Sequence, residues 1–217
     1  MLTVLYEDNH CLAVLKPARL LTMGDDTGDT TLVDLARDYL RQKYSKPGNV
    51  FVGVVHRLDR PVSGVVLFAR TSKGAARLSE QFRLGTVEKK YQAIVTGKLE
   101  GELVEWRDWL FKNERTNTVQ CIAEGTPGAR ESLLRCRRLR QIGSRVLLEV
   151  TPITGRSHQI RAQLAARGLP IVGDGKYGSR VPFHEGCIAL HATSLTFQHP
   201  TREERIEVNS PLPSNWF

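Results

Sequence analysis

The decisive stretch of this sequence runs from Val55 to Ala69 and reads VHRLDRPVSGVVLFA. It sets one acidic residue, Asp59, in a basic and turn-like segment, because Pro61 and Gly64 disfavour a continuous helix. The apolar residues that follow predict a strand. A loop held at the end of a strand is a usual place for a catalytic side chain, since the scaffold fixes the side chain and the loop exposes it. The plain alternative is a surface aspartate paired with the neighbouring arginines.

Strand-like runs recur along the whole chain and outnumber helical ones. Three helices are expected: the first capped by Thr30 or Thr31, the second capped by Ser72, and the third over residues 157–167 with Gly168 as its stop. Because strands do not alternate one for one with helices, the pattern predicts an α+β fold with a mixed, mostly antiparallel β-sheet core and flanking helices. The expected strands cover residues 2–6, 11–15, 64–69, 90–95, 103–110, 118–122, 132–139, 146–150, 188–197 and 205–208.

The amino-acid composition indicates what kind of molecule the chain binds. The chain has 217 residues, enough for one large domain or two small ones with a sizeable core. Lysine and arginine exceed aspartate and glutamate by 31 to 23, which gives a net charge of +8. Such an excess favours a polyanionic partner, and RNA or DNA is the first expectation. The four cysteines are scattered and form no Cys-x-x-Cys pair, so no metal site is expected.

The sequence carries no sign of a membrane or export role. No stretch approaches the apolar length that spans a bilayer. The first residues lack the basic region and the apolar core of a signal peptide. A reducing cytoplasm is therefore the expected location, and a monomer is the default state.

Further motif-like segments follow the Asp59 loop in order along the chain. Together with the opening residues 6–18 and the HRLD motif at residues 56–59, they closely resemble the RluA-type family of RNA pseudouridine synthases. The resemblance extends over nearly the whole chain, from about Leu2 to Pro200. The further segments are EKKYQAIVTG at 88–97, TGRSHQIR at 154–161, GLPIVGD at 168–174, Tyr177-Gly178, LHA at 190–192 and FQHP at 197–200.

The resemblance implies a fold and a reaction. The family fold is a mixed β-sheet core split by a central catalytic cleft, here expected as a single catalytic domain over residues 1–217. Many relatives carry an S4-type RNA-binding domain first, and this module is expected to be absent because the motifs begin almost at Met1. The implied reaction turns specific uridines of RNA into pseudouridine by moving the ribose bond from uracil N1 to C5. No atoms are gained or lost, so no cofactor is expected.

The resemblance also assigns the catalytic residues. Asp59 matches the essential carboxylate, which acts as nucleophile or base on an everted nucleotide. Arg161 matches its basic partner, which keeps the carboxylate charged although burial favours the neutral form. Tyr91 matches a tyrosine that stacks on the base. An exposed helix position for Arg161 and a core position for Tyr91 are the alternatives. Replacing Arg161 by Met is expected to remove most activity and keep the fold.

The same motifs supply a set of expected substrate-binding residues: Arg57, Leu190, His56, Ile160 and Arg156. Arg57 resembles the side chain that takes the vacated place in the RNA, and Leu190 matches an apolar residue that lines the pocket. His56 is expected to support the loop and not to transfer protons. Val62 stands where the family usually has threonine, so a hydrogen bond made there in relatives is expected to be missing.

A basic run between residues 130 and 145 holds one acid, Glu131. It is expected either to follow RNA phosphates or to form a solvated strand face, and the sequence does not decide between them. The run consists of Arg130, Arg135, Arg137, Arg138, Arg140 and Arg145.

Two rival functions stay open at this point. One is a non-catalytic RNA-binding or folding factor, and the other is a hydrolase that cleaves nucleoside glycosidic bonds with a single aspartate. The expected substrate is tRNA or large-subunit rRNA, with no DNA or membrane partner. The target uridine cannot be read from the sequence.

Overall fold

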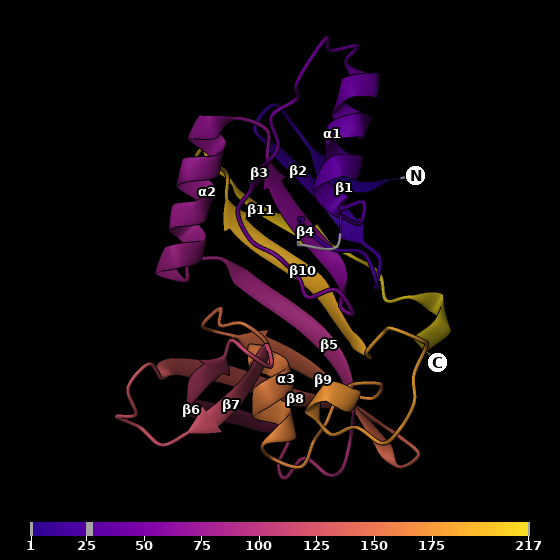
Figure 1. Cartoon of the computed structure of the whole chain (residues 1–217), viewed down its shortest axis with the longest axis vertical. Coiled ribbons are helices and arrows are strands. Elements are labelled where there is room, and N and C mark those ends of the chain that lie inside the picture. The colour runs from indigo at the N-terminus through magenta and orange to yellow at the C-terminus, as the bar shows by residue number, and fades with distance from the viewer. Residues whose placement is uncertain (1, 25–27, 217) are drawn as a thin grey trace. The chain divides into compact units, whose positions relative to one another are not determined.

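The computed structural model describes residues 2–24 and 28–216, and the chain divides into two compact units (Figure 1). The first unit comprises Met1–Glu88 and Ala192–Asn215, and the second comprises Lys89–His191 together with Trp216. A single catalytic domain over residues 1–217 stays a prediction. Among the described residues, every helix is too short or too polar to cross a lipid bilayer.

The first unit is built on a sheet with the strand order β1-β2-β4-β10, in which β11 lies beside β10 and β3 beside β4. The pairings of β1 with β2, β2 with β4, β3 with β4 and β10 with β11 are antiparallel. All residues of β4 are buried, because strands border it on both sides. The strands are β1 (Thr3–Glu7), β2 (Cys11–Lys16), β3 (Gly53–Val54), β4 (Ser63–Ala69), β10 (Leu190–Gln198) and β11 (Arg205–Asn209).

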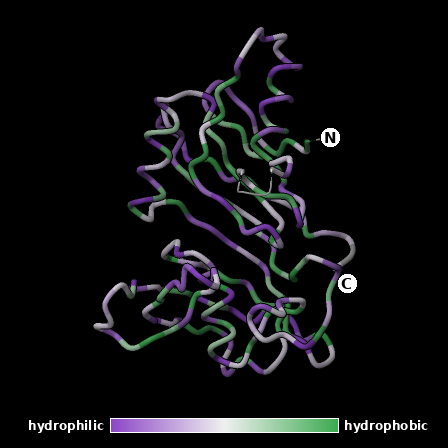
Figure 2. The backbone as a smooth tube through the Cα atoms, viewed as in Figure 1, coloured by the Kyte–Doolittle hydropathy of each residue, from purple (hydrophilic) through white to green (hydrophobic). Residues whose placement is uncertain are grey.

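Two helices complete the first unit. Helix α2 (Ser72–Leu84) packs Ala75, Leu78 and Phe82 against a cluster that includes Leu67 of β4 and Phe197 of β10. In Figure 2 this helix alternates between hydrophilic and hydrophobic positions, as expected for a helix with one buried face. Helix α1 (Leu32–Lys43) is attached to the end of β1 through a carboxylate. That carboxylate, Glu7, accepts hydrogen bonds from Tyr39, Lys43 and Tyr44.

Gly64 at the start of β4 is required by a close approach of two strands. Its φ is +124°, in the region that residues with a side chain rarely adopt. A Cβ at this position would overlap the backbone O and N atoms of Ala192 in β10. Gly64 therefore allows the backbone conformation that follows the Asp59 loop, and it allows β10 to approach β4 closely.

The second unit has a sheet with the order β5-β9-β8-β6-β7, and its described pairings are antiparallel. Helix α3 (Gln159–Ala165) contacts β6, β7, β8 and β9 on one face of this sheet, where Ala162 packs with Leu110 and Val119. A short 3-10 helix, η1 (Gly175–Tyr177), follows α3. A second one, η2 (Ser214–Trp216), has its first two residues in the first unit. The strands are β5 (Glu88–Thr96), β6 (Leu103–Asn113), β7 (Thr118–Ile122), β8 (Arg130–Ile142) and β9 (Arg145–Pro152).

The predicted α+β class with a mostly antiparallel sheet is confirmed. Each expected strand is present, and the two-residue strand β3 is an addition that the sequence pattern missed. Thr31 caps α1 in a capping box with Asp34, as expected. The cap of α2 is Thr71, one residue before the expected Ser72. Helix α3 starts at Gln159 and not at Ser157, because His158 has a left-handed backbone with φ 48° and ψ 19°.

Candidate functional site

The Asp59 loop ends in a tight turn that leads into β4. The N–H of Val62 donates to the carbonyl of Asp59 at 3.0 Å, and Ser63 begins the strand. The side chain of Asp59 is half-buried, between the exposed Arg57 and Arg60. Val62, in place of the family's threonine, is 3% exposed, so its apolar side chain packs into the interior. The turn thus holds the Asp59 carboxylate on a backbone that is fixed by strand β4 on its C-terminal side.

Buried donors from the preceding segment brace the same loop. Lys16 is fully buried and donates from Nζ to the carbonyls of Pro17, Leu20 and Arg60 at 3.1, 2.7 and 3.2 Å. Thr22 exchanges two hydrogen bonds with the backbone of Leu58: its hydroxyl donates to the carbonyl at 3.0 Å and accepts from the N–H at 3.2 Å. The residues on both sides of Asp59 are therefore tied to the buried segment 16–22.

His56, in the segment before Asp59, contacts strand β4 and helix α2. Its Nε2 accepts a hydrogen bond from the backbone N–H of Leu67 at 2.9 Å, and its ring stacks on Phe82 with centroids 4.5 Å apart. An imidazole that accepts at Nε2 carries its neutral-form proton on Nδ1. Arg60 bonds Asp29 at 2.7 Å and the carbonyl of Arg19 at 3.1 Å.

Arg161 lies in the second unit and is held by a carboxylate that sequence reasoning missed. It is 5% exposed, which rules out the exposed helix position. Its Nε and one terminal nitrogen donate to the two oxygens of Asp174 at 2.7 and 2.8 Å, and Asp174 is itself 1% exposed. The guanidinium also lies over the ring of Tyr177, 4.8 Å from the centroid. Such a two-point contact fixes both the position and the plane of the guanidinium.

Tyr177 joins this arrangement to helix α3 and to the sheet. Its hydroxyl accepts a hydrogen bond from the N–H of Val119 at 2.9 Å and lies 2.7 Å from Nδ1 of His158. With one hydroxyl lone pair engaged by Val119, the hydroxyl proton can be donated to His158. His158 makes this contact from a left-handed backbone at the start of α3. The motif residues Asp174, Tyr177 and His158 therefore serve a common purpose, which is to hold Arg161.

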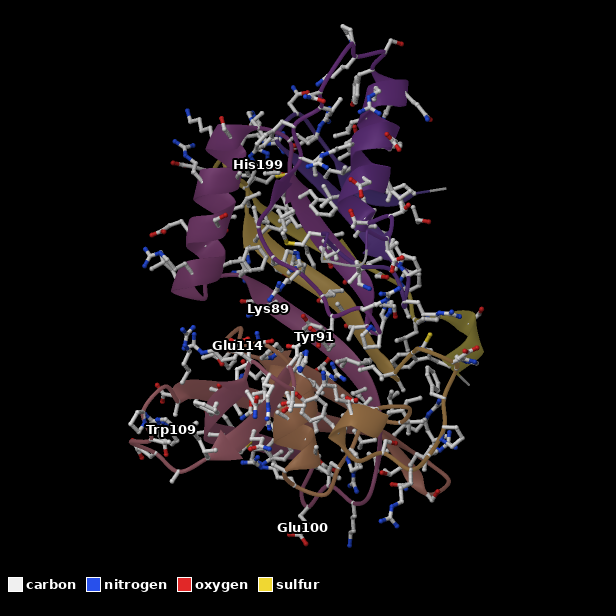
Figure 3. All side chains as sticks on the ribbon, in the orientation of Figure 1. Lys89, Tyr91, Glu100, Trp109, Glu114 and His199 are labelled. Carbon is white, nitrogen blue, oxygen red and sulfur yellow. The ribbon has the colours of Figure 1, made fainter. Side chains whose placement is uncertain are left out.

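The remaining predicted residues of the second unit surround these elements. The TGRSHQIR segment is clamped by Gln159, whose side chain donates to the carbonyl of Leu133 at 2.9 Å and accepts from the N–H of Arg156 at 3.0 Å. Ile160 and Leu190 are buried, whereas Arg156 is exposed. Tyr91 is half-buried on β5 opposite Val150 of β9, where Figure 3 labels it.

The structure groups the predicted residues by unit. Asp59, His56 and Arg57 belong to the first unit, and Tyr91 and Arg161 to the second. The pairing of Asp59 with Arg161 joins different units and stays a prediction. Asp174 was missed as a partner of Arg161, although the GLPIVGD motif contains it.

Among the described residues, one group has the spacing of metal ligands: the ligand atoms of Asp8, Cys11 and His199 lie within 4.8 Å of one another. The His199 and Asp8 atoms already form hydrogen bonds. His199 accepts at Nδ1 from the N–H of Arg202 at 3.0 Å and bonds Asp8 through Nε2 at 2.8 Å. Burial raises the pKa of the Cys11 thiol to about 12, which disfavours the thiolate that metals require. The group fits a hydrogen-bonded structural cluster better than a metal site.

The basic run on β8 is partly neutralised by acids from neighbouring strands. Arg135 pairs with Glu105 of β6 at 2.8 Å, and Arg137 pairs with Glu149 of β9 at 2.9 Å. The sequence pattern counted only the acid within the run and so missed these cross-strand pairs. They favour the solvated strand face at these two positions.

Comparisons with known proteins show which sequences this chain resembles. A family model described as RNA pseudouridylate synthase matches residues 10–166. The ribosomal large subunit pseudouridine synthase C of Vibrio cholerae is 32% identical over 218 residues, which cover 98% of this chain and 66% of the relative. The tRNA pseudouridine synthase C of Haemophilus influenzae is 32% identical over 237 residues, which cover 100% of this chain and 95% of the relative. The chain thus spans just under two thirds of the length of the ribosomal relative.

Two solved human structures share the fold. RNA Pseudouridylate Synthase Domain Containing 4 has a TM-score of 0.81 at 22% identity, with 98% of this chain and 89% of that chain covered. RNA Pseudouridylate Synthase Domain Containing 1 has a TM-score of 0.75 at 26% identity, with 97% and 83% covered. Since the family model matches more than half of the sequence and relatives match nearly all of it, the chain belongs to the RNA pseudouridylate synthase family, as its motifs implied.

Proposed function

We propose that the chain is an isomerase that converts specific uridines of tRNA or rRNA to pseudouridine, with Asp59 as the essential carboxylate. Family membership supports the reaction. The observation that carries the assignment of Asp59 is its loop, in which a buried lysine and a buried threonine fix the backbone on both sides of a half-buried carboxylate. A surface aspartate without a role would not need such bracing.

The reaction needs a protein that positions the uridine and supplies a charged group beside it. The bond between N1 and C1′ breaks, the uracil turns, and C5 forms a new bond to C1′. The hydrogen on C5 leaves as a proton, and N1 takes up a proton, so atoms and charge balance. Asp59 supplies the carboxylate that acts on the nucleoside, either at a ring or sugar carbon or by removing a sugar proton.

The target base must leave its stack before it reaches a carboxylate, at a cost of a few kcal/mol. Stacking on an aromatic side chain such as Tyr91 returns about 1–3 kcal/mol of this cost. Arg161 supplies a cation that Asp174 and Tyr177 have already placed. We propose that this cation faces Asp59 during the reaction. A cytoplasmic monomer that acts on RNA and not on DNA belongs to the same proposal.

Tritium release tests the function. Transcripts of tRNA and of large-subunit rRNA carrying 5-tritiated uridine are incubated with wild-type protein, with Asp59→Asn and with a matched control, Asp38→Asn. Asp38 is an exposed residue of α1 that pairs with Arg41. We expect release by the wild type and the control and at least a thousandfold loss in Asp59→Asn.

Each rival function has its own outcome in the same assay. Free uracil among the products would identify a hydrolase, because an isomerase leaves the base attached to the RNA. Binding of the transcripts without release of tritium would identify a binding factor. Full activity of Asp59→Asn would remove Asp59 from the mechanism and leave the reaction class standing.

A further inference from the structure

Lys89 is a half-buried cation with one hydrogen-bond partner in the described part of the chain. Its Nζ donates to the carbonyl of Thr154 at 3.3 Å. An ammonium group has three donors, so this contact uses only one. Among residues 2–24 and 28–216 no carboxylate forms an ion pair with it. The other buried basic residues differ: Arg161 has a carboxylate, and Lys16 has three carbonyls.

A half-buried charge without a counter-ion is unfavourable, since burial removes water that the single Thr154 carbonyl replaces only in part. Burial accordingly lowers the pKa of Lys89 below its ordinary value. A protein retains such a group when a ligand supplies the missing charge, and the charge that fits is an anion. In a member of an RNA-modifying family the abundant anion is the phosphodiester.

Space for the anion exists next to the ammonium. Gly155 is exposed, and a Cβ built on it would meet Nζ of Lys89 at 3.7 Å and, apart from its chain neighbours Thr154 and Arg156, no other residue within 4 Å. Its φ is not in the left-handed region, so the backbone does not require glycine here. The lack of a side chain therefore leaves the approach to Nζ open.

The backbone around Gly155 is rigid and carries a second cation. Thr154 accepts from the N–H of Leu133 at 3.0 Å through its hydroxyl, and the N–H of Arg156 donates to Gln159 at 3.0 Å. Arg156 is exposed and anchors its Nε on the carbonyl of Glu131 at 3.0 Å. A lysine, a glycine and an arginine on fixed backbone are the usual components of a phosphate site.

Lys89 also lies on the same side of strand β5 as Tyr91. The two residues are two positions apart on β5, where Figure 3 labels both, so their side chains leave the same side of the strand about 7 Å apart. This spacing is on the scale of one nucleotide. A base stacked on Tyr91 would thus bring a neighbouring phosphate within reach of Lys89.

We propose that Lys89, with Gly155 and Arg156, binds a phosphodiester of the substrate RNA beside the nucleotide that stacks on Tyr91. The proposal rests on the proposed function, because it assumes that RNA is the ligand. It adds Lys89 to the site as a residue that binds substrate and takes no part in breaking or forming bonds.

The test is equilibrium binding of unlabelled tRNA and large-subunit rRNA transcripts at several salt concentrations. Lys89→Met, Lys89→Arg and Lys98→Met are compared, all in an Asp59→Asn background that prevents turnover. Lys98 is an exposed lysine just beyond the same strand and serves as the matched control. We expect Lys89→Met to raise Kd about tenfold and to reduce the slope of log K against log salt by about 0.7–0.9, the loss of one phosphate contact. Lys89→Arg is expected to restore both values, and Lys98→Met to leave them unchanged.

Three outcomes would overturn the proposal. One is a salt slope in Lys89→Met equal to that of its parent. Another is a loss of affinity that comes with a lower melting temperature and that Lys89→Arg does not restore, because Lys89 would then only support the Thr154 carbonyl. The third is a protein that binds neither transcript. Tritium release by the otherwise wild-type chain is scored separately, so a failure of the isomerase assignment with an intact salt effect would leave Lys89 as a phosphate contact.

Discussion

At the scale of single residues, the buried ion pair of Arg161 and Asp174 means that a substitution of Arg161 affects stability as well as activity. The pair is enclosed, with side chains 6% and 1% exposed. Removing one partner of a buried ion pair leaves the other as an uncompensated charge, which typically costs about 3–5 kcal/mol. The expectation that Arg161→Met keeps the fold therefore needs revision, because Asp174 would lose its partner.

The first prediction separates the two roles of Arg161. Arg161→Met is expected to lower the free energy of unfolding by about 3–5 kcal/mol. The double variant Arg161→Met, Asp174→Asn is expected to regain most of this stability, since it buries no lone charge. Tritium release should stay at the background level in both variants, because neither has the guanidinium. Urea unfolding followed by circular dichroism, with tritium release measured in parallel, provides the check.

Recovery of activity in the double variant would show that Arg161 acts only through stability. Tyr177→Phe is a less disruptive variant than Arg161→Met. It keeps the ring under the guanidinium and removes only the hydroxyl that contacts His158 and Val119.

Single residues also mark the limit of sequence reasoning. Motif resemblance selected Asp59 and Tyr91, and their roles stay predictions. The partnership of Arg161 with Asp174 was not anticipated, because it depends on how η1 folds back onto α3. The pairs of Arg135 and Arg137 with acids on other strands were missed for the same reason: a charge count along the chain sees only its own strand.

At the scale of elements, strands were more predictable than helix ends. Thr118–Ile122 was expected at its observed bounds, since an apolar run between turn residues is a local signal. The start of α3 follows a left-handed residue, His158, and a residue other than glycine at this position gives no local sequence signal for such a backbone. The start of α2 was misplaced by one residue because Thr71 and Ser72 are both good caps.

The cap of α2 gives a direct test. Thr71 has an extended backbone, and its hydroxyl accepts from the N–H of Gly74 at 3.1 Å. Thr71→Ala is expected to destabilise the protein by about 1 kcal/mol, whereas Ser72→Ala should stay within about 0.5 kcal/mol of the wild type. The urea midpoints of the two variants measure these losses of stability and show which residue caps the helix. An equal loss in both would mean that the helix has no single cap.

At the scale of the whole molecule, a carboxylate near the start of the chain is tied to residues near its end. Asp8 accepts hydrogen bonds from the N–H groups of His10 and Cys11, from the Tyr6 hydroxyl and from His199. Burial alone would raise the pKa of Asp8, but these hydrogen bonds outweigh it and hold the pKa at about 2, against an ordinary value of 3.8.

A lowered carboxyl pKa predicts an acid-sensitive fold. The unfolded chain takes up the proton at higher pH than the folded one, so the stabilisation is complete above about pH 4 and is lost as the pH falls toward about 2. The shift of nearly two units corresponds to about 2 kcal/mol. We expect the loss of stability between pH 4.5 and pH 2.5 to be about 1.5 kcal/mol smaller in Asp8→Asn than in the wild type, because part of the stabilisation remains at pH 2.5. Urea titrations at both pH values measure it, and parallel losses in the two proteins would contradict the assignment.

The division of the chain has a consequence for its synthesis. The first unit takes its strands from both ends of the sequence, and β10, a direct neighbour of β4, is among the last to be made. As the chain emerges from a ribosome, β4 acquires β2 and the short β3 early, yet most of its second edge stays open until about residue 198 has been translated. The Asp59 loop leads directly into that strand. Until β10 has been made, Asp59 therefore precedes a strand whose edge toward β10 is unpaired, and premature termination before β10 yields a product in which Gly64 has no Ala192 to pack against.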